Sequence, residues 1–325
     1  MVMAQSLFMT LAREHPGVRI DVLAPAWSQP LLARMPEVNQ AISVPIAHGE
    51  LRLAARYRLG RQLRGRKYAR AIVIPRSFKA ALIPFFARVP QRTGYRGESR
   101  YGLINDMRPL DRQVLSQTVQ RYVALSLERG VSLPPPVPYP HLTVDESNRA
   151  AVCERLGLQT GRPVVAMMPG AEYGPAKCWP AARFAEVARR LSEEGRQIWL
   201  LGSERDRPVA EEIVTGSGGQ VFNLCGKTRL EDVVDLLSLV QLALTNDSGL
   251  MHVAAATGRH VIAIYGSSTP RYTPPLSDKA HVVYLDVECS PCFKRICPYG
   301  HTRCLNEISA AQVLDRIAEV SNAHL

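Results

Sequence analysis

The 325-residue sequence predicts an α/β protein made of two doubly wound domains. Short aliphatic runs alternate with amphipathic segments of about ten to fifteen residues, which is typical of parallel strands joined by helical crossovers. Five prolines fall in the seven positions 134–140, a run that neither a helix nor a central strand tolerates. Residues 242–267 follow one another as strand, turn, helix and strand. We therefore expect a domain on either side of the proline-rich run.

The predicted strands share short runs of buried-type residues. In order they are Ile20–Leu23, Ile42–Val44, Ala71–Ile74, Val164–Met167, Ile198–Leu201, Val221–Leu224, Leu242–Thr245, Val261–Ile264 and Val282–Leu285. Between them, apolar residues recur at helical spacing after Trp179 and Pro180, at positions Phe184, Val187, Ala188 and Leu191. We expect domains over residues 1–140 and 141–308, with a C-terminal helix in 309–325 that packs back on the first domain.

The start of the chain departs from the pattern of a doubly wound domain. Residues Met1–Arg13 predict a helix, and the first strand follows only at Ile20. Such a domain normally opens with a strand. We therefore expect that a strand is missing ahead of the first helix.

Charge is divided unevenly between the halves. The formal net charge is 40 − 29 = +11, with 22 Lys and Arg against 10 Asp and Glu in residues 1–150 and 18 against 19 in residues 151–325. The run Arg52–Arg108 holds fifteen basic residues, and Glu98 and Asp106 are its acids. A basic surface of this kind attracts nucleic acid, anionic lipid or a phosphorylated substrate, although solvated helix faces explain individual residues equally well.

Neither a membrane span nor a secretory signal is evident in the sequence. No run reaches the roughly 18 apolar residues that a spanning helix needs, and the first residues lack a charged segment and a cleavage site. We expect a cytoplasmic protein. No Gly-x-Gly-x-x-Gly follows a strand, and Walker and nucleophile-elbow motifs are absent, which disfavours dehydrogenases, P-loop enzymes and hydrolases.

The most informative motif is the polar turn Asn246–Gly249, between a buried strand and a helix of small residues. The free N–H groups of the helix that begins near Gly249 form an anion site, although Asp247 or Ser248 can instead cap that helix. His252 lies one turn further on, either as a core residue or within reach of the same ligand.

Two further strand ends carry polar residues. Lys177 follows Gly170 and Gly174 in the loop 168–180, where a cation beside a helix start can neutralise a diphosphate. After the next strand, Glu204 or Asp206 can accept from ribose hydroxyls, although Asp206 can equally cap a helix. Four cysteines cluster as Cys289, Cys292, Cys297 and Cys304, a spacing that permits a structural zinc site, an occasional disulfide or free thiols; we expect no catalytic metal.

Four segments together carry a family resemblance. They are TNDSGLMHVAAATG, PGAEYGPAKCWP, CSPCFKRICPYGHTRCL and MVMAQSLFMTL. The sequence resembles the ADP-heptose:lipopolysaccharide heptosyltransferases of glycosyltransferase family 9 over essentially its whole length. The resemblance implies a GT-B architecture of two Rossmann-like domains, an acceptor-binding domain in residues 1–140 and an ADP-heptose-binding domain in 141–308.

By the same resemblance, heptose is transferred with inversion to the first heptose of the lipopolysaccharide inner core. Lys177 and Asp247 are the expected catalytic residues: Lys177 neutralises the diphosphate and Asp247 contacts heptose hydroxyls. The amides of Ser248 and Gly249 bind the diphosphate, His252 supports the loop or the phosphates, and Glu204 contacts the ribose. No cofactor is required by this comparison, which leaves assistance by a divalent cation open.

The general base is not named by these residues. In the family it lies on a Gly-Asp loop that would stand just ahead of Met1, after the missing strand, so residues 1–325 alone are expected to lack transfer activity. The implied partners are ADP-heptose, the core acceptor and the cytoplasmic surface of the inner membrane, bound peripherally, without nucleic acid. Alternatives are another nucleotide-sugar transferase or epimerase of the same fold, or a basic nucleic-acid-binding protein.

Overall fold

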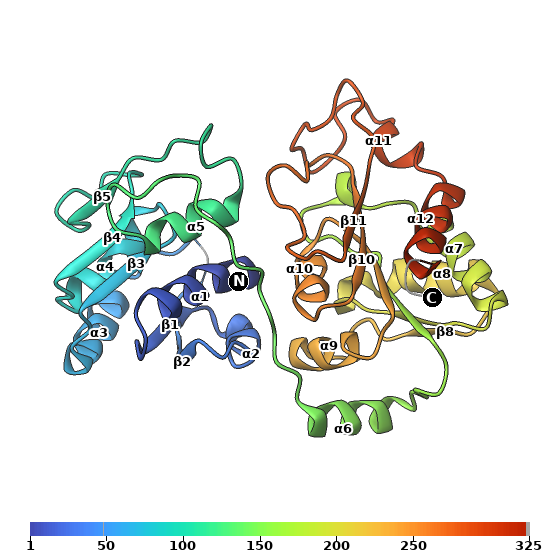
Figure 1. Ribbon diagram of the computed structural model, residues 1–325, viewed down its shortest axis with the longest axis horizontal. Helices are drawn as coiled ribbons and strands as arrows, with labels where there is room; N and C mark the ends of the chain where they lie inside the picture. Colours follow the sequence, from blue (N-terminus) through green and yellow to red (C-terminus); the bar gives the residue numbers. More distant parts are fainter. Residues whose placement is uncertain (48, 323–325) are drawn as a thin grey trace. The chain divides into compact units, whose positions relative to one another are not determined.

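A computed structural model describes residues 1–47 and 49–322, and the chain forms two compact units. Unit 1 comprises Met1, Met3–Ala33 and Glu37–Pro138, and unit 2 comprises Val2, Arg34–Pro36 and the chain from Tyr139 onward. The division falls between Pro138 and Tyr139, inside the proline-rich run. Figure 1 shows both units, with labels on most of their helices and strands. Within the described residues, no helix has the length and apolar character needed to cross a bilayer.

Unit 2 contains a six-stranded, fully parallel sheet in the order β11-β10-β9-β6-β7-β8. Its strands are β6 Val164–Met168, β7 Gln197–Leu200, β8 Val221–Asn223, β9 Leu242–Asn246, β10 His260–Tyr265 and β11 Ala280–Tyr284. The first strand of the unit, β6, is central and every residue of it is buried. Because all strands run the same way, their carboxyl ends share one edge of the sheet, where ligands bind in doubly wound folds.

The helices of unit 2 cover both faces of this sheet. They are α6 Glu146–Leu156, α7 Ala181–Glu193, α8 Arg207–Ser217, α9 Leu230–Leu237, α10 Gly249–Ala256, α11 Arg303–Asn306 and α12 Ala310–Asn322. Helices α7, α8 and α12 lie on one face, and α9 and α10 lie on the other (Figure 1). The predicted apolar stripe of α7 is buried in the core, and Pro180 is its N-cap residue. Helices therefore pack on both faces of the sheet that carries the loops at its carboxyl edge.

The C-terminal helix α12 packs against α7 and β10 of unit 2. Its apolar residues Val313, Ile317 and Val320 belong to the same core as Leu191. Packing of this helix on the first domain stays a prediction from the sequence. The last part of the predicted range, residues 323–325, lies outside the described residues.

Unit 1 contains two separate parallel sheets. Strand β1 Ile20–Ala24 pairs with β2 Val38–Ser43, and the second sheet has the order β3-β4-β5, with β3 Arg70–Val73, β4 Gln91–Tyr95 and β5 Asp106–Arg108. The helical elements are η1 Val2–Ala4, α1 Gln5–Glu14, η2 Ala26–Ser28, α2 Gln29–Leu32, α3 Leu53–Leu63, η3 Arg64–Arg66, α4 Phe78–Phe86 and α5 Thr118–Ser126. Helix α1 packs against α5, and α3 packs against α4.

Two strands of unit 1 were missed from the sequence, and one was misplaced. Strand β4 reads Gln-Arg-Thr-Gly-Tyr and β5 has three residues, so neither shows an aliphatic run. The strand predicted at Ile42–Val44 is β2, which begins four residues earlier, at Val38. The sequence does not show this start, because Asn39 and Gln40 are polar and exposed. Pairing with a neighbouring strand, rather than local composition, makes these segments extended.

Much of the basic run of unit 1 serves the fold. Arginines that are partly or fully buried donate to main-chain carbonyl groups; these are Arg56, Arg64, Arg70, Arg92, Arg100 and Arg108. Eight of the fifteen basic residues keep exposed side chains: Arg52, Arg58, Arg61, Arg66, Lys67, Arg76, Arg88 and Arg96. These eight are therefore the part of the run that can attract an anionic partner.

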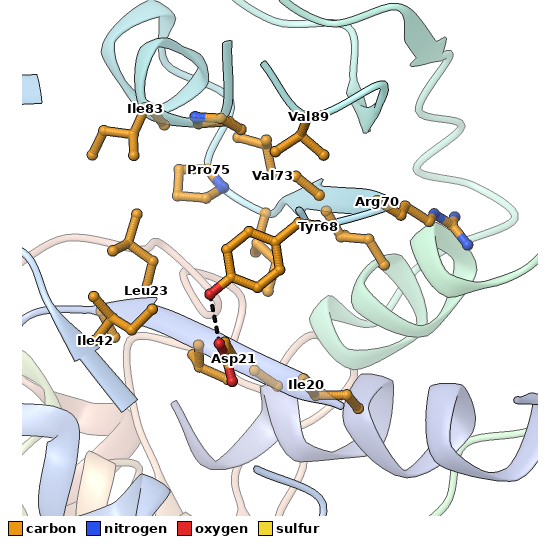
Figure 2. A pocket seen from close by; sticks show the side chains of 18 of the residues that line it. Ile20, Asp21, Leu23, Ile42, Tyr68, Arg70, Val73, Pro75, Ile83 and Val89 are labelled. Atoms are coloured by element: carbon orange, nitrogen blue, oxygen red, sulfur yellow. Dashed lines mark hydrogen bonds between the residues drawn. The ribbon is translucent and has the colours of Figure 1, made fainter. Parts of the chain in front are cut away.

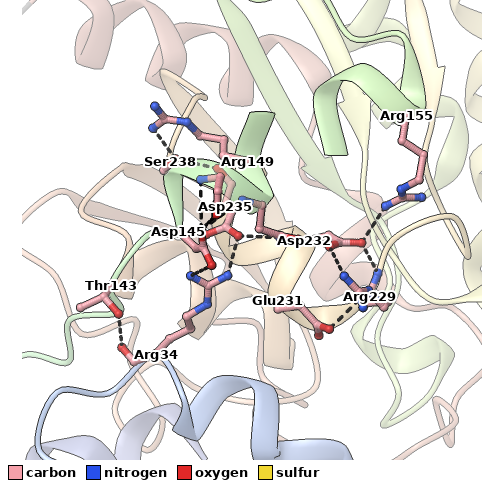
Figure 3. A network of polar contacts seen from close by, with 12 residues as sticks. Arg34, Thr143, Asp145, Arg149, Arg155, Arg229, Glu231, Asp232, Asp235 and Ser238 are labelled. Atoms are coloured by element: carbon pink, nitrogen blue, oxygen red, sulfur yellow. Dashed lines mark hydrogen bonds and ion pairs between the residues drawn. The ribbon is translucent and has the colours of Figure 1, made fainter. Parts of the chain in front are cut away.

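A buried polar network in unit 2 joins α6 to α9 (Figure 3). The carboxylate of Asp235 is fully buried and accepts from the guanidinium of Arg34 at 2.6 Å, from the side chain of Asn148 at 2.7 Å and from the N–H of Asp145 at 2.9 Å. Asp145 in turn caps the first turn of α6. The network explains why residues 34–36 belong to unit 2.

We predict that Asp235→Asn destabilises unit 2, because it removes the carboxylate that lies 2.6 Å from the nearly buried Arg34 guanidinium and leaves it the more distant carboxylate of Asp145, at 3.9 Å. Breaking one partner of a buried pair costs about 3–5 kcal/mol. The free energy of unfolding, measured with denaturant, checks this. The control is Glu146→Gln, which removes the exposed partner of Arg149 and should cost less than about 1 kcal/mol. Equal losses in the two variants would contradict the importance of the network.

Candidate functional site

The centre of the candidate site is an ion pair between two loops at the carboxyl edge of the unit 2 sheet. The Lys177 ammonium lies 2.5 Å from Oδ2 of Asp247, and the Ser268 hydroxyl donates to the same oxygen at 2.5 Å. The three residues follow β6, β9 and β10. Asp247 is buried, and the Lys177 side chain keeps 16% of its surface exposed. The fold thus brings Lys177 and Asp247 together, and the lysine is the member of the pair that solvent can reach.

Asn246, the last residue of β9, fixes the lysine loop to the sheet. Its side-chain oxygen accepts from the backbone N–H of Trp179 at 3.0 Å, and its amide nitrogen donates to the carbonyl of Pro169 at 2.6 Å. Trp179 is also held through its indole N–H, which donates to the carbonyl of Ile308 at 3.0 Å. Both ends of the loop 169–179 are therefore clamped by one fully buried side chain.

The cysteine-rich segment, residues 289–304, also holds the lysine loop. The N–H of Ala176 donates to the carbonyl of Arg295 at 3.1 Å, and the hydroxyl of Tyr173 donates to the carbonyl of Phe293 at 2.7 Å. The Tyr173 ring lies 5.0 Å from the Lys177 ammonium and 5.4 Å from the Arg295 guanidinium. An aromatic face between two cations stabilises both of them, by about 0.5–1 kcal/mol at exposed sites. These contacts hold the Lys177 ammonium in position beside Asp247.

Helix α10 starts without a side-chain cap. Its N-cap residue is Ser248, whose side chain accepts no hydrogen bond from the first turn. Gly249 is exposed, and a methyl group on it would meet no other described atom within 4 Å. The first N–H groups of α10 are therefore open to a ligand, and an anion there would gain roughly 0.3–1 kcal/mol from the helix field. Neither the Asp247 nor the Ser248 side chain caps the helix, which was the alternative expected from the sequence.

His252 lies in the first turn of α10, and its Nδ1 atom is buried without a hydrogen-bond partner among the described residues. Burial lowers the pKa of His252 to about 4, against a smaller raising effect of Asp247. The imidazole is therefore neutral at physiological pH. Support of the loop or of the phosphates by this neutral side chain stays a prediction.

The third strand end carries Glu204 and Asp206. Glu204 begins the short helix η5 Glu204–Asp206, is exposed, and pairs with Arg207 at 3.0 Å. Asp206 accepts from the backbone N–H and the hydroxyl of Ser203, both at 2.8 Å, so it caps this turn. Glu204 keeps an exposed carboxylate at the carboxyl edge, which is compatible with the ribose contact that stays a prediction.

The four clustered cysteines line a small cavity of about 10 Å³ together with Tyr299 and His301. Their thiols are free. Burial, and next the neighbouring thiols, raise the pKa of Cys304 to about 11. Across residues 1–47 and 49–322, no group of three or more His, Cys, Asp or Glu side chains has an arrangement that could hold a metal ion. The zinc alternative gains no support, and the segment serves the lysine loop through its backbone.

Several residues of the site were not found from the sequence. Ser268 follows a buried strand directly, so the rule that ligands bind at carboxyl ends could have found it. Tyr173 and Arg295 carried no such signal, because the contact between them joins segments far apart in the sequence. Asn246 was recognised as a turn residue, but its two bonds to the lysine loop depend on the sheet.

The chain is similar to known proteins in both sequence and structure. The model of the family described as glycosyltransferase family 9 (heptosyltransferase) matches residues 56–303, most of the chain. The chain belongs to glycosyltransferase family 9. It is 46% identical to lipopolysaccharide heptosyltransferase 2 of Salmonella typhimurium and 45% identical to that of Escherichia coli K12, each over 98% of this chain and 94% of the relative.

The solved structures agree with this family assignment. The structure described as E. coli ADP-heptose lps heptosyltransferase II matches with a TM-score of 0.86 and 42% identity, over 98% of this chain and 94% of that one. A glycosyl transferase family 9 structure from Veillonella parvula has a TM-score of 0.85 at 21% identity, over 98% of this chain and 92% of that one, and shows the same fold. As a member of family 9, the chain is a glycosyltransferase with the GT-B fold, as the sequence predicted.

For this family 9 protein we predict a stability that depends on pH through His252. The unfolded chain takes up a proton near pH 6.5, whereas the folded chain takes it up only near pH 4. The free energy of unfolding should therefore fall as the pH drops from about 6.5 to 4, by on the order of 1–3 kcal/mol. The comparison is with His252→Gln, which should lose this part of the pH dependence. Identical pH profiles for the two proteins would show that the ring is protonated equally in both states.

Proposed function

We propose that the chain transfers heptose from ADP-heptose to the first heptose of the lipopolysaccharide inner core, with inversion at the anomeric carbon. Relatives that bear the name heptosyltransferase 2 align with 98% of the chain, and the name of the similar E. coli structure includes ADP-heptose. The observation that carries the proposal is that Lys177 and the uncapped start of α10 lie at the same edge of one sheet. A cation and free N–H groups are what a sugar diphosphate requires.

The donor would bind along the carboxyl edge of unit 2. Its diphosphate would accept hydrogen bonds from the N–H groups of Ser248 and Gly249, and Lys177 would neutralise its charge. Oδ2 of Asp247 is already engaged by Lys177 and Ser268, so Oδ1 would be the acceptor for heptose hydroxyls. Glu204, exposed after β7, would contact the ribose. Each charged hydrogen bond of this kind contributes about 1.5–3 kcal/mol.

Lys177 would act by changing partners. Without a ligand its ammonium is paired with Asp247, which leaves neither charge alone in a partly buried site. A diphosphate carries more negative charge than one carboxylate, and its charge grows as the glycosidic bond to ADP breaks. Attraction to Lys177 is therefore strongest in the transition state, which is the condition for a contact to accelerate the reaction. The acceptor hydroxyl attacks in one displacement and needs a general base on the acceptor side.

The acceptor would bind to unit 1 at the cytoplasmic surface of the inner membrane, with peripheral attachment. The support is the set of eight exposed basic residues between Arg52 and Arg96. A Lys or Arg near an anionic membrane surface contributes about 1 kcal/mol. Arg76 and Arg96 follow the carboxyl ends of β3 and β4, where a ligand of a doubly wound unit is expected.

We predict that Lys177→Ala lowers the affinity for ADP roughly ten- to a hundredfold, the effect of one charged hydrogen bond. Titration calorimetry with ADP and UDP measures it, and wild-type protein should prefer ADP. The matched control is Lys279→Ala, an exposed lysine just before β11, which should bind ADP normally. A preference of the wild-type protein for UDP would contradict the proposed donor.

A double variant separates two explanations for that loss. If Lys177 merely neutralises Asp247, then Lys177→Ala with Asp247→Asn should recover the wild-type affinity for ADP. If Lys177 contacts the diphosphate, as we propose, the double variant should stay weak. ADP is the suitable ligand because it lacks the heptose that Asp247 is proposed to contact.

We predict that changing Arg76 and Arg96 together to Gln weakens binding of a phosphorylated core acceptor about tenfold or more while ADP affinity stays within a factor of two, since two phosphate-facing charges are removed. Acceptor binding is measured by calorimetry with deacylated core oligosaccharide. The control removes the same charge from Lys67 and Arg88, which precede β3 and β4 at the opposite ends of the strands. Equal loss in both pairs would indicate a general charge effect instead of a site.

A further inference from the structure

Two hollows of the molecule differ in the chemistry of their walls. The large one, about 2200 Å³ in unit 1, has no cysteine among the described residues that line it. Figure 2 shows aliphatic side chains such as Leu23 and Val73 on its walls, and the Tyr68 hydroxyl donating to Asp21 at 2.5 Å. The small one, about 10 Å³ in unit 2, is lined by four of the seven cysteines of the chain, Cys289, Cys292, Cys297 and Cys304. Nucleophilic side chains thus gather at the small cavity, and the contacts proposed for the donor use none of them.

Cys304 is the buried member of this cluster. It lies in α11 and belongs to the apolar core of unit 2, whereas the other three cysteines are partly exposed. Burial, and next the three neighbouring thiols, raise the pKa of Cys304 to about 11. Cys304 therefore keeps its proton at neutral pH, and the core fixes its position.

Cys297 has the opposite environment. Its side chain is partly exposed, and the backbone N–H of Thr302 donates to its sulfur, as do those of Tyr299, Gly300 and His301. These donors, foremost that of Thr302, lower the pKa of the Cys297 thiol against the raising effect of desolvation. The thiolate is the form of cysteine that attacks oxidants. Cys297 is therefore the reactive thiol of the cluster.

We propose that Cys297 is a modification site for hydrogen peroxide, and that Cys304 is the second thiol, which turns the first product into a disulfide. The Cys297 sulfur attacks one oxygen of the peroxide, the O–O bond breaks, and the leaving hydroxide takes up a proton and departs as water. Cys297 is then a sulfenic acid. The Cys304 sulfur gives up its proton and attacks the Cys297 sulfur, so that the S–S bond forms and the S–O bond breaks. The hydroxide and that proton leave as a second water, and two thiols have reduced one peroxide.

The backbone favours Cys304 over Cys289 and Cys292 as the second thiol. Thr302, whose N–H donates to the Cys297 sulfur, is the N-cap residue of α11, and Cys304 is the second residue of that helix. The hydrogen bond therefore holds the start of α11 beside the Cys297 sulfur. Oxidation of Cys297 also removes the negative charge of its thiolate, which is one of the effects that keep the proton on Cys304. The first step thus prepares the second.

The disulfide acts on the lysine loop through Arg295. The thiols are free, so the bond has to bring the two sulfurs to about 2.05 Å. Cys304 is packed in the core, whereas residues 286–302 contain neither helix nor strand, so Cys297 is the residue that moves. Arg295 stands two residues before it, and the Arg295 carbonyl accepts from the N–H of Ala176 at 3.1 Å.

The same carbonyl lies close against Gly174. A methyl group on Gly174 would stand 2.7 Å from the Arg295 oxygen, so the two backbones touch at this point. A shift of Arg295 therefore reaches the loop that carries Lys177, and the disulfide loosens this loop.

The test treats the full chain, reduced and then freed of reductant, with a small excess of hydrogen peroxide. Unreacted thiols are blocked with N-ethylmaleimide, and tryptic peptides are identified by mass spectrometry without reduction. Cleavage after Lys and Arg separates the thiols into peptides 280–294 with Cys289 and Cys292, 296–303 with Cys297, and 304–316 with Cys304. We expect peptide 296–303 linked to 304–316 as the main product, and its disappearance on treatment with dithiothreitol.

Variants separate the roles of the two thiols. Cys304→Ser should leave Cys297 as a sulfenic acid, which dimedone traps on peptide 296–303. Cys297→Ser should form no such link. The matched control is Cys153→Ser, which removes a partly exposed cysteine of α6 and should react like the wild-type protein. Within the wild-type protein, Cys297 should be oxidised at least about tenfold faster than Cys153, whose pKa is raised by burial.

Hydrogen–deuterium exchange measures the effect on the lysine loop. In the disulfide form, exchange in residues 169–179 should be at least about tenfold faster than in the reduced protein, with α9 as an unchanged internal reference. Cys297→Ser treated with peroxide should exchange like the reduced protein. Unchanged exchange of the loop in the disulfide form would overturn its coupling to the cysteines.

Four results would overturn the modification site itself. They are equal oxidation rates at Cys297 and Cys153, links through peptide 280–294 in place of 304–316, a disulfide between two chains, and one equivalent of zinc bound to the purified protein. In the last case the thiolates would be metal ligands and would not be free to attack peroxide.

Discussion

Parallel backbone pairing is the constraint on which the rest of this molecule depends. In unit 2, six strands that run the same way bring β6, β7, β9 and β10 to a common edge. Residues that are distant in sequence then meet there, and Lys177 faces Asp247 and Ser268. The common direction of the strands therefore fixes where the site lies, and its side chains supply the charge and the hydrogen-bonding groups.

The charges in the site balance each other. Lys177 and Asp247 neutralise each other in a partly buried place, where one ion alone would be costly. In the proposed reaction, the diphosphate would take over Lys177, and Asp247 would be left in contact with hydroxyl groups. The Ser268 hydroxyl holds the carboxylate of Asp247, and the Tyr173 ring contacts the ammonium of Lys177. Binding would thus exchange one set of ionic contacts for another.

Sequence reasoning was most successful where local chemistry decides the structure. The buried runs of unit 2, the α7 stripe and the Asn246–Gly249 turn each have a pattern of their own. It failed where a distant partner decides. Strand β4 is extended because β3 and β5 flank it. The contacts of Tyr173 and Arg295 could be seen only after both segments were folded.

The clamps on the lysine loop have a consequence for synthesis of the chain. Trp179 is bonded to Asn246 and Ile308, which are 67 and 129 residues further along. Chains emerge from the ribosome from the N-terminus, so β6 and its loop exist well before the groups that hold them. The loop therefore stays unclamped until nearly the whole of unit 2 has been translated. A nascent chain released early would carry Lys177 but not the geometry that makes it useful.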